Sequence, residues 1–470
     1  MSWAWLLLLA HSLIALYCVH HILLNKREPR AAIGWIAVCV AYPFLGAMLY
    51  SLFGINRVST LAKALKADAQ SGDPGRPVER ELSCYFDTPQ LAALVQSSSA
   101  VTMRPMTAGN AITPYFDGES AYAAMLEAID RAQHTVYLAS YIFDSDQTGE
   151  RFVATLAAAQ RRGVRVRVLV DGVGEWYSWP RISASLRKAG LSVSRFLPPR
   201  LFPPMLHVNL RNHRKLLLVD GQTAFTGGMN IGDRQLSLKP DGKPGSNDIH
   251  FCLRGPVIGQ FQRVFEEDWY FSRGEDTEFQ PAAGPVAGGA VCRAITDGPN
   301  EDLGKLEMII TGAIALARHR VRIMTPYFLP EVGIMRAMQA AALRGVEVSL
   351  ILPAQNNLPF VDWAMRHVLD ELLACGVNVY YQPPPFAHTK FLLIDDVYAL
   401  IGSANLDARS LRLNFELVVE VFDEKFVARL AEHFAEVKAQ SASLTLADLQ
   451  GRSMPAKLRD AAVWLFSPYL

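Results

Sequence analysis

The chain has 470 residues, and 46 Lys and Arg side chains nearly balance 45 Asp and Glu, for a formal net charge of +1. The near-zero net charge therefore does not favour a nucleic-acid-binding protein, although the sequence still allows a local basic patch. The length exceeds one ordinary core and suggests two halves plus an anchor. Its six cysteines are scattered without a C-x-x-C pair, so neither a zinc cluster nor a disulfide framework is indicated; one disulfide remains open.

Two apolar segments open the chain. Residues 2–24 and 31–53 each contain 23 residues without Asp, Glu, Lys or Arg. As helices rising about 1.5 Å per residue, both can cross a hydrocarbon core about 30 Å thick. We therefore predict two transmembrane helices in an anchor over 1–54, with the N-terminus and the main body on one side. A cleaved signal peptide is disfavoured because the first segment lacks a basic start. Basic residues lie both in the loop between the two segments and after the second segment, so their distribution does not indicate which side of the membrane carries the main body.

The rest of the chain alternates predicted helices and strands, which indicates an α/β fold. A polar connector is expected over 55–108, a first half over 109–280, a Pro/Gly/Ala-rich linker over 281–290 and a second half over 291–470. Both halves show the same order of elements. Helices are predicted at 122–131, 150–162, 306–318 and 332–343, and strands at 135–142, 164–170, 320–324 and 346–352.

Two octets of the form H-x-K-x-x-x-x-D are the most specific pattern in the sequence. They begin at His213 and His388, which are 175 residues apart. Each is followed by a turn of small residues that ends in Asn230 or Asn405, and these are also 175 residues apart. A single octet reads most simply as a half-exposed edge strand. Two octets in register predict a duplicated unit that brings two imidazoles and two ammonium groups to one site.

Each octet is an apolar run that predicts a buried strand. Side chains alternate along a strand, so His213 and Lys215 should share one face, as should His388 and Lys390. The aspartates that close the octets have the opposite parity and lie where a hairpin turn is expected. We therefore expect them to support the architecture rather than touch a substrate. They are Asp220 and Asp395.

The pairing of two His with two Lys suits phosphoryl transfer. One imidazole can act as nucleophile or base while the other acts as acid, and ammonium groups stabilise charge around phosphorus. A covalent phosphohistidine would divide one difficult displacement into two steps. A carboxylate on the far ring nitrogen would orient each imidazole. Asp248 and Glu416 are the candidates, and either can instead be an ordinary salt-bridge partner.

The octets and their turns resemble the HKD motifs of the phospholipase D superfamily. Further segments are similar to those of bacterial cardiolipin synthases: Gly402–Glu416, Tyr141–Phe143, Thr325–Phe328 and Leu465–Leu470. The resemblance covers essentially the whole chain. It implies two similar α/β sandwich halves around a pseudo-twofold active site, preceded by the two transmembrane helices. It also implies a multi-pass protein of the bacterial inner membrane.

The resemblance further implies that one phosphatidylglycerol gives its phosphatidyl group to another, yielding cardiolipin and glycerol without a metal or other cofactor. The family's usual assignment makes His213 the nucleophile and His388 the proton donor. Phosphatidylglycerol and the bilayer are the expected partners, nucleic acid is not, and the oligomeric state is open. The catalytic set is His213, Lys215, Asp220, His388, Lys390 and Asp395; Lys215, Lys390, Asn230 and Asn405 bind substrate, and Asp248 and Glu416 orient the imidazoles.

Three rival functions remain. A phospholipase D-type hydrolase, or a phosphatidyltransferase using another donor such as phosphatidylethanolamine, needs the same octets. A nuclease on this fold is disfavoured by the apolar segments and neutral charge, and an inactive scaffold by two complete octets. Three apolar stretches can face lipid or can be rigid loops: Leu201–Leu206, Pro383–Phe386 and Gly174–Pro180.

Overall fold

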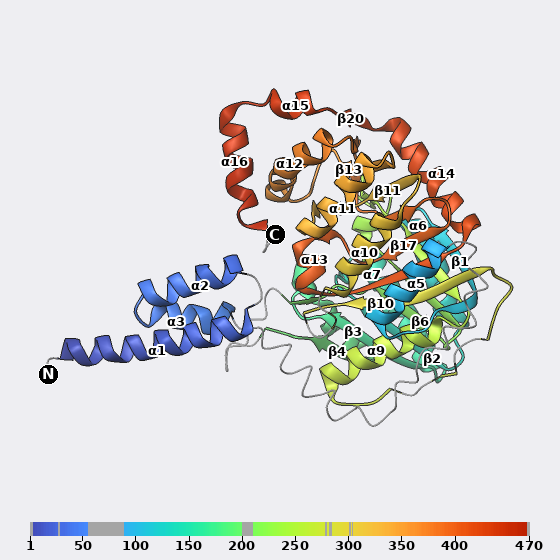
Figure 1. The fold of residues 1–470 in the computed structure, drawn as a ribbon. Coiled ribbons are helices and arrows are strands. Elements are labelled where there is room, and N and C mark those ends of the chain that lie inside the picture. The colour runs from blue at the N-terminus through green and yellow to red at the C-terminus, as the bar shows by residue number, and fades with distance from the viewer. Residues whose placement is uncertain are drawn as a thin grey trace. The chain divides into compact units, whose positions relative to one another are not determined.

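The computed structural model describes residues 3–26, 29–54, 89–199, 210–277, 280–281, 284–299, 302 and 304–467. The chain divides into two compact units. One consists of Met1–Gln70 with Leu201–Leu206, and the other of Ser71–Arg200 with His207–Leu470. Both units are drawn in Figure 1.

The N-terminal unit contains one long apolar helix, α1 (Trp3–Asn25). Within the described residues it is the one helix long and apolar enough to cross a membrane. The second predicted helix, over 31–53, is wrong as a single helix. The chain instead forms α2 (Pro29–Ala41), α3 (Leu45–Leu49) and the π-helical turn η1 (Tyr50–Gly54).

Local chemistry explains this interruption. Pro43 has no N–H to continue the hydrogen-bond ladder, and its ring disfavours helical backbone at the residue before it. Phe44 then takes a positive φ of 59° and redirects the chain. Apolar composition alone does not reveal this break, because every residue around it is compatible with a bilayer.

The second unit, Ser71–Arg200 with His207–Leu470, is built on one 16-stranded sheet in which the two halves repeat the same strand order. The halves meet where β1 (Thr107–Tyr115) pairs antiparallel with β10 (Ala290–Asp297). Outward from β1 run β9 (His250–Arg254), β7 (Thr223–Gly227), β6 (Leu216–Val219), β2 (Thr135–Ser140), β3 (Arg165–Asp171) and β4 (Ser192–Phe196). Outward from β10 run β19 (Asn414–Phe422), β17 (Tyr398–Gly402), β16 (Phe391–Ile394), β11 (Arg320–Met324), β13 (Glu347–Pro353), β14 (Asn378–Gln382) and β20 (Ala442–Leu444).

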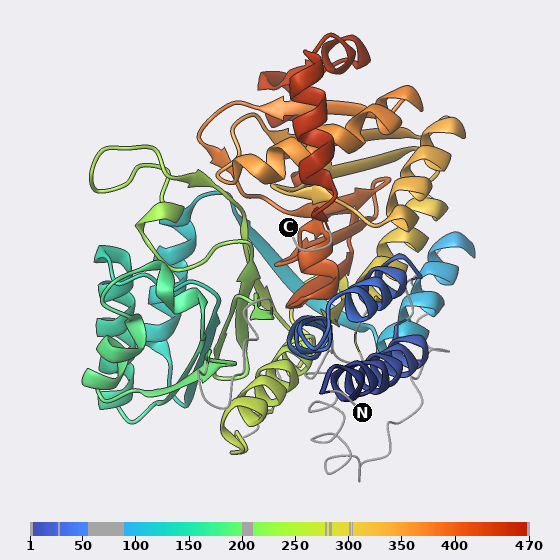
Figure 2. The ribbon, with the colours of Figure 1, turned by 90° about the vertical axis from the view of Figure 1, so that its left-hand side faces the viewer.

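Helices cover both faces of this sheet (Figures 1 and 2). In the first half, α6 (Gly118–Arg131), α7 (Gln147–Arg161) and α8 (Ile182–Lys188) enclose one apolar core, and α9 (Ile258–Arg273) contacts the sheet through β4, β6 and β10. In the second half the covering helices are α10 (Lys305–Leu316), α11 (Val332–Leu343) and α12 (Pro359–Ala374), with the shorter α13 (Ala408–Arg412), α15 (Leu446–Gln450) and α16 (Met454–Trp464). α14 (Glu424–Gln440) contacts the sheet through β11, β14 and β17. The predicted mixed α/β fold is therefore confirmed.

The four helices and four strands predicted as the repeated elements of the two halves all occur, with boundaries that agree or differ by a few residues. Helix starts depend on caps: the Asp117 carboxylate accepts a bond from Ser120 N at 2.7 Å, which places the start of α6 ahead of the prediction. Of the predicted connector, residues 55–88 lie outside the described part. The remainder holds α5 (Pro89–Thr102), whose Ser98 hydroxyl donates to Glu420 of β19 at 3.0 Å.

Candidate active site

Next to each octet histidine, a short strand of its own half pairs with a strand of the other half. β5 (Arg211–Asn212) runs parallel to the start of β19, and the His213 N–H donates to the Phe415 carbonyl at 3.0 Å. β15 (Phe386–Ala387) runs parallel to β8 (Ser246–Asn247), and the His388 N–H donates to the Asn247 carbonyl at 2.7 Å. The residue that follows each acceptor is a carboxylate. Each histidine therefore meets a carboxylate of the other half.

These pairings correct the prediction that each octet is one continuous strand. His213–Lys215 and His388–Lys390 lie between strands, because the chain there changes from one pairing partner to another. Only the apolar part of each octet joins the main sheet, as β6 and β16. The Lys215 ammonium folds back to the His213 carbonyl at 2.7 Å.

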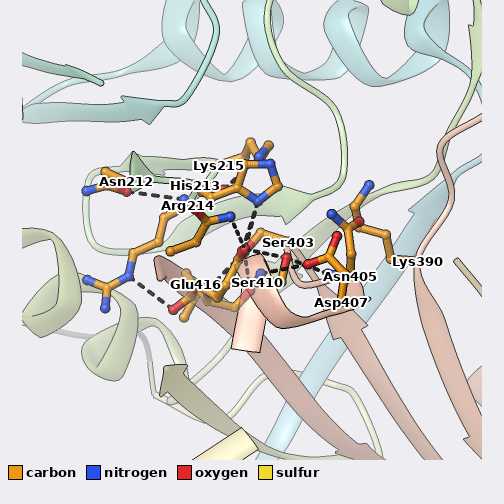
Figure 3. A network of polar contacts seen from close by, with 12 residues as sticks. Asn212, His213, Arg214, Lys215, Lys390, Ser403, Asn405, Asp407, Ser410 and Glu416 are labelled. Atoms are coloured by element: carbon orange, nitrogen blue, oxygen red, sulfur yellow. Dashed lines mark hydrogen bonds and ion pairs between the residues drawn. The ribbon is translucent and has the colours of Figure 1, made fainter. Parts of the chain in front are cut away.

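Glu416 holds His213 within a dense polar network (Figure 3). Its carboxylate oxygens lie 2.9 and 3.0 Å from His213 Nδ1. The same carboxylate accepts bonds from Ser403 Oγ at 2.5 Å, Ser410 Oγ at 2.9 Å and Asn414 Nδ2 at 3.2 Å. Because Nδ1 is occupied, Nε2 is the ring nitrogen of His213 left for chemistry.

Asp248 holds His388 in the corresponding way but with fewer partners. Asp248 Oδ2 lies 2.8 Å from His388 Nδ1, and Oδ1 accepts from the Ile249 N–H at 2.8 Å. The Lys390 ammonium lies 3.2 Å from His388 Nε2. A Cβ atom on Gly228 would come within 2.5 Å of both carboxylate oxygens of Asp248. The first turn therefore needs glycine where the second has Ser403.

Burial sets the charge state of the site. It lowers the pKa of both His213 and His388 to about 4, even though Glu416 and Asp248 respectively raise it. The resting imidazoles are therefore neutral near pH 7. Burial also lowers the pKa of Lys390 to about 8 and that of Lys215 well below its usual range. The pKa of Glu416 is lowered despite burial, because His213 and Lys215 favour its anion.

The octet aspartates lie at hairpin turns and hold backbone. Asp220 accepts N–H bonds from Gln133, His134 and Thr135 at 2.7–2.8 Å. Asp395 accepts from the N–H groups of residues 318–320 at 2.8–3.1 Å. Both take a positive φ, of 54° and 50°. In each half this carboxylate ties the β6–β7 or β16–β17 hairpin to the start of β2 or β11.

The two predicted substrate-binding asparagines are buried in equivalent turns. Asn230 Oδ1 accepts from the Ile142 N–H at 3.1 Å, which fixes the amide, and its carbonyl accepts from Tyr122 Oη at 2.6 Å. Asn405 donates its backbone N–H to Ser410 Oγ at 3.1 Å. Its side-chain oxygen is buried without a hydrogen-bond partner among the described residues.

Several residues of the site were not predicted from sequence. Ser403 and Ser410 donate hydrogen bonds to the Glu416 carboxylate. No sequence motif indicates this role for Ser410. Arg214 points away from the imidazoles and bonds Asp268 at 2.6 Å. The Tyr141 ring packs edge-on against the His213 ring at 5.0 Å, inside a segment whose resemblance to the family was the one available signal.

Comparison with known proteins assigns the family. The family model described as cardiolipin synthase, PLD-like domain, matches residues 125–269 and 310–438. The chain belongs to this family. A second model, described as phospholipase D-nuclease N-terminal, matches residues 13–54 of this cardiolipin synthase family member.

Curated cardiolipin synthases are similar along nearly the whole chain. That of Geobacillus thermodenitrificans is 30% identical, covering 95% of this chain and 90% of its own. The major cardiolipin synthase of Bacillus subtilis is 29% identical (97% and 99%), and cardiolipin synthase A of Pseudomonas fluorescens is 32% identical (88% and 87%). Among solved structures, phosphatidylserine synthase of Haemophilus influenzae matches with a TM-score of 0.63 at 14% identity, over 80% of this chain and 100% of that one. That last likeness supports the fold alone.

Proposed function

We propose that this protein is a membrane-bound cardiolipin synthase that joins two phosphatidylglycerol molecules and releases glycerol. The observation that carries the proposal is the pair of complete histidine–carboxylate contacts made across the two halves, each with a buried lysine beside it. Two matched imidazoles in one site suit a two-step transfer in which each step needs one nucleophile and one proton carrier.

In the first step His213 Nε2 attacks the phosphorus of one phosphatidylglycerol. The bond from phosphorus to the headgroup glycerol oxygen breaks, and His388 gives that oxygen a proton. His388 must therefore be protonated once substrate is bound, although burial favours its neutral form in the empty site. The anionic phosphodiester supplies the missing stabilisation, because a nearby negative charge raises the pKa of an imidazole.

In the second step a headgroup hydroxyl of another phosphatidylglycerol attacks the phosphatidyl-histidine. His388, now neutral, takes the hydroxyl proton, the phosphorus–nitrogen bond breaks, and cardiolipin leaves. We assign Lys215, Lys390, Asn230 and Asn405 to the non-bridging phosphate oxygens, where ammonium and amide groups stabilise the charge around phosphorus. Glu416 and Asp248 orient the rings and stabilise their cationic forms. Asp220 and Asp395 act through the backbone they hold.

The surroundings of His213 favour a lipid substrate. Tyr141 packs on this ring, and the Tyr177 ring lies 6.1 Å from Tyr141. Tyr177 belongs to an exposed aromatic group with Trp176 and Trp179, the latter 86% exposed. Aromatic side chains of this kind suit the interface of a bilayer. We place them at the entrance for the lipid headgroup. The neighbouring apolar stretch Leu201–Leu206 lies outside the described residues.

We propose that the protein is attached through α1 to the inner membrane of a bacterium. We also propose that its catalytic part consists of two repeated domains, over 109–280 and 291–470, joined by a linker at 281–290.

The test uses purified full-length protein in liposomes with phosphatidylglycerol, radiolabelled both in its headgroup glycerol and in its acyl chains, as the sole phospholipid. Cardiolipin with an equimolar release of glycerol is expected. Phosphatidic acid as the main product would mean that water takes the phosphatidyl group and that the protein is a hydrolase. If no product forms until phosphatidylethanolamine is added, the donor assignment is wrong. His213→Ala and His388→Ala should each abolish turnover, and full activity in either variant contradicts the mechanism.

A further inference from the structure

The anchor does not have the geometry of two helices that cross a membrane side by side. α1 spans 23 residues, about 34 Å at 1.5 Å per residue, which matches a hydrocarbon core of about 30 Å. α2 has 13 residues and so reaches only about 20 Å. α3 and η1 together add 10 residues after the break at Pro43 and Phe44. Neither part is long enough to cross alone.

Contacts with α1 show how far the second segment reaches. His11 Nε2 lies 3.3 Å from the Val40 carbonyl near the end of α2, and the His11 ring packs against Phe44 with centroids 5.9 Å apart. His11 stands about 21 Å from the end of α1 at Asn25 and about 12 Å from its start at Trp3. The turn after α2 therefore lies level with the middle of α1.

Beyond this turn the chain runs back the way it came. Tyr50, the first residue of η1, accepts or donates a bond with His21 Nδ1 through its hydroxyl at 2.8 Å, and its ring lies 5.5 Å from Trp35 of α2. His21 is only four residues from the end of α1. If α2 continued as one crossing helix, Tyr50 would lie near Trp5 instead. The chain thus leaves the anchor at the same end as Asn25.

The turn has features that suit an apolar surrounding. The Tyr42 N–H donates to Val38 O at 3.1 Å and the Gly46 N–H donates to Tyr42 O at 3.0 Å, so these backbone groups are satisfied within the anchor. Gly46 lets α3 approach α2 closely, because a Cβ atom there would lie 2.2 Å from Val38 O. Small residues at such contacts are what close helix packing in a membrane requires.

We infer that α2, α3 and η1 form a re-entrant hairpin that enters the bilayer beside α1 and returns, so that the N-terminus and the C-terminus of the chain lie on opposite sides of the membrane. Residues 55–88 carry ten charged side chains spread along their length, so this stretch offers no further apolar crossing. The lipid bilayer is the partner of the exposed apolar side chains of α1. The inference concerns the anchor and does not depend on the reaction catalysed.

Sidedness is the first test. Full-length protein carrying different epitope tags at its two ends is placed in sealed vesicles, and both tags are probed with antibody before and after detergent. One tag accessible and the other protected is expected in vesicles of uniform orientation. Both accessible together, or both protected together, would overturn the inference and restore two crossings.

Crosslinking tests the path independently. In a background with all native cysteines replaced, His21→Cys with Tyr50→Cys should crosslink under a membrane-permeant oxidant. Trp5→Cys with Tyr50→Cys should not. Trypsin cleaves at Lys26, Arg27 and Arg30, so a linked pair of peptides is identified by mass spectrometry. Crosslinking of the Trp5 pair in preference to the His21 pair refutes the hairpin.

Two glycines supply a matched pair for the turn. Gly46→Leu should reduce the yield of the His21–Tyr50 crosslink several-fold. Gly34→Leu adds the same side chain to α2 where no atom lies within 4 Å of the added Cβ, and should leave the yield unchanged. Equal yields in the two variants would show that the close approach of α3 to α2 does not exist in the membrane.

Discussion

Replacing Glu416 by Gln removes one negative charge beside His213 while keeping the size of the side chain. In the mechanism we propose, the phosphatidylated His213 ring carries a positive charge; in the structure the Glu416 carboxylate lies 2.9–3.0 Å from Nδ1 of His213. Charge centres about 4 Å apart interact by about 4 kcal/mol at an effective dielectric constant of about 20. At 1.4 kcal/mol per tenfold change, kcat should fall about 10³-fold.

The assay is cardiolipin formation from phosphatidylglycerol at saturating substrate, with thermal unfolding of each variant measured in the same detergent. Glu347→Gln is the control, because that carboxylate lies at the surface end of β13 and pairs with Lys438. It should leave kcat unchanged. A well-folded Glu416→Gln variant that keeps kcat within about threefold of the unsubstituted protein would refute the role given to the carboxylate.

Three further predictions follow from the same site. Because the pKa of Lys390 is lowered to about 8, kcat/KM should fall as pH rises above about 8. In Lys390→Arg this fall should begin at a higher pH, because the guanidinium stays protonated. A fall at the same pH in both proteins would mean that another group titrates. Asp220→Ala leaves three backbone N–H groups without their acceptor and should lower the free energy of unfolding by about 2–4 kcal/mol, with Asp220→Asn intermediate, as measured by denaturant unfolding. Burial lowers the pKa of His213 and His388 to about 4, whereas both imidazoles titrate near about 6.5 in the unfolded chain. As pH falls from about 6.5 to about 4, the unfolded state therefore binds protons that the folded state does not, and the free energy of unfolding should drop in this range. Replacing both histidines by Gln should flatten that drop.

Sequence spacing predicts which side chains lie together, because the two octets and the residues that follow them are in register; the roles assigned to these side chains stay predictions. The hairpin turns at Asp220 and Asp395, and the carboxylates at positions 248 and 416, lie where the octets and their spacing suggested. The crossing of the two halves was not predictable in detail. The pairings β5 with β19 and β8 with β15 join segments far apart in the chain, and no local pattern encodes them.

The errors also have a physical origin. An apolar run predicts a buried strand wherever it occurs, so the octets were extended through His213 and His388, where the chain in fact changes partners. A hydropathy pattern measures compatibility with lipid but not the direction of the backbone. Pro43 and the positive φ of Phe44 therefore break the second apolar segment, although its composition suits a continuous membrane helix.

The exchange of carboxylates between the halves has a consequence for the newly made chain. When the first half has been translated as far as residue 280, His213 is present but Glu416 is still 136 codons (416 − 280) from translation. Asp248 likewise waits for a histidine that does not yet exist. A partly synthesised chain thus holds neither histidine–carboxylate pair, and in the mechanism we propose it cannot cleave lipid. Both pairs form only when the two halves have been made and have come together.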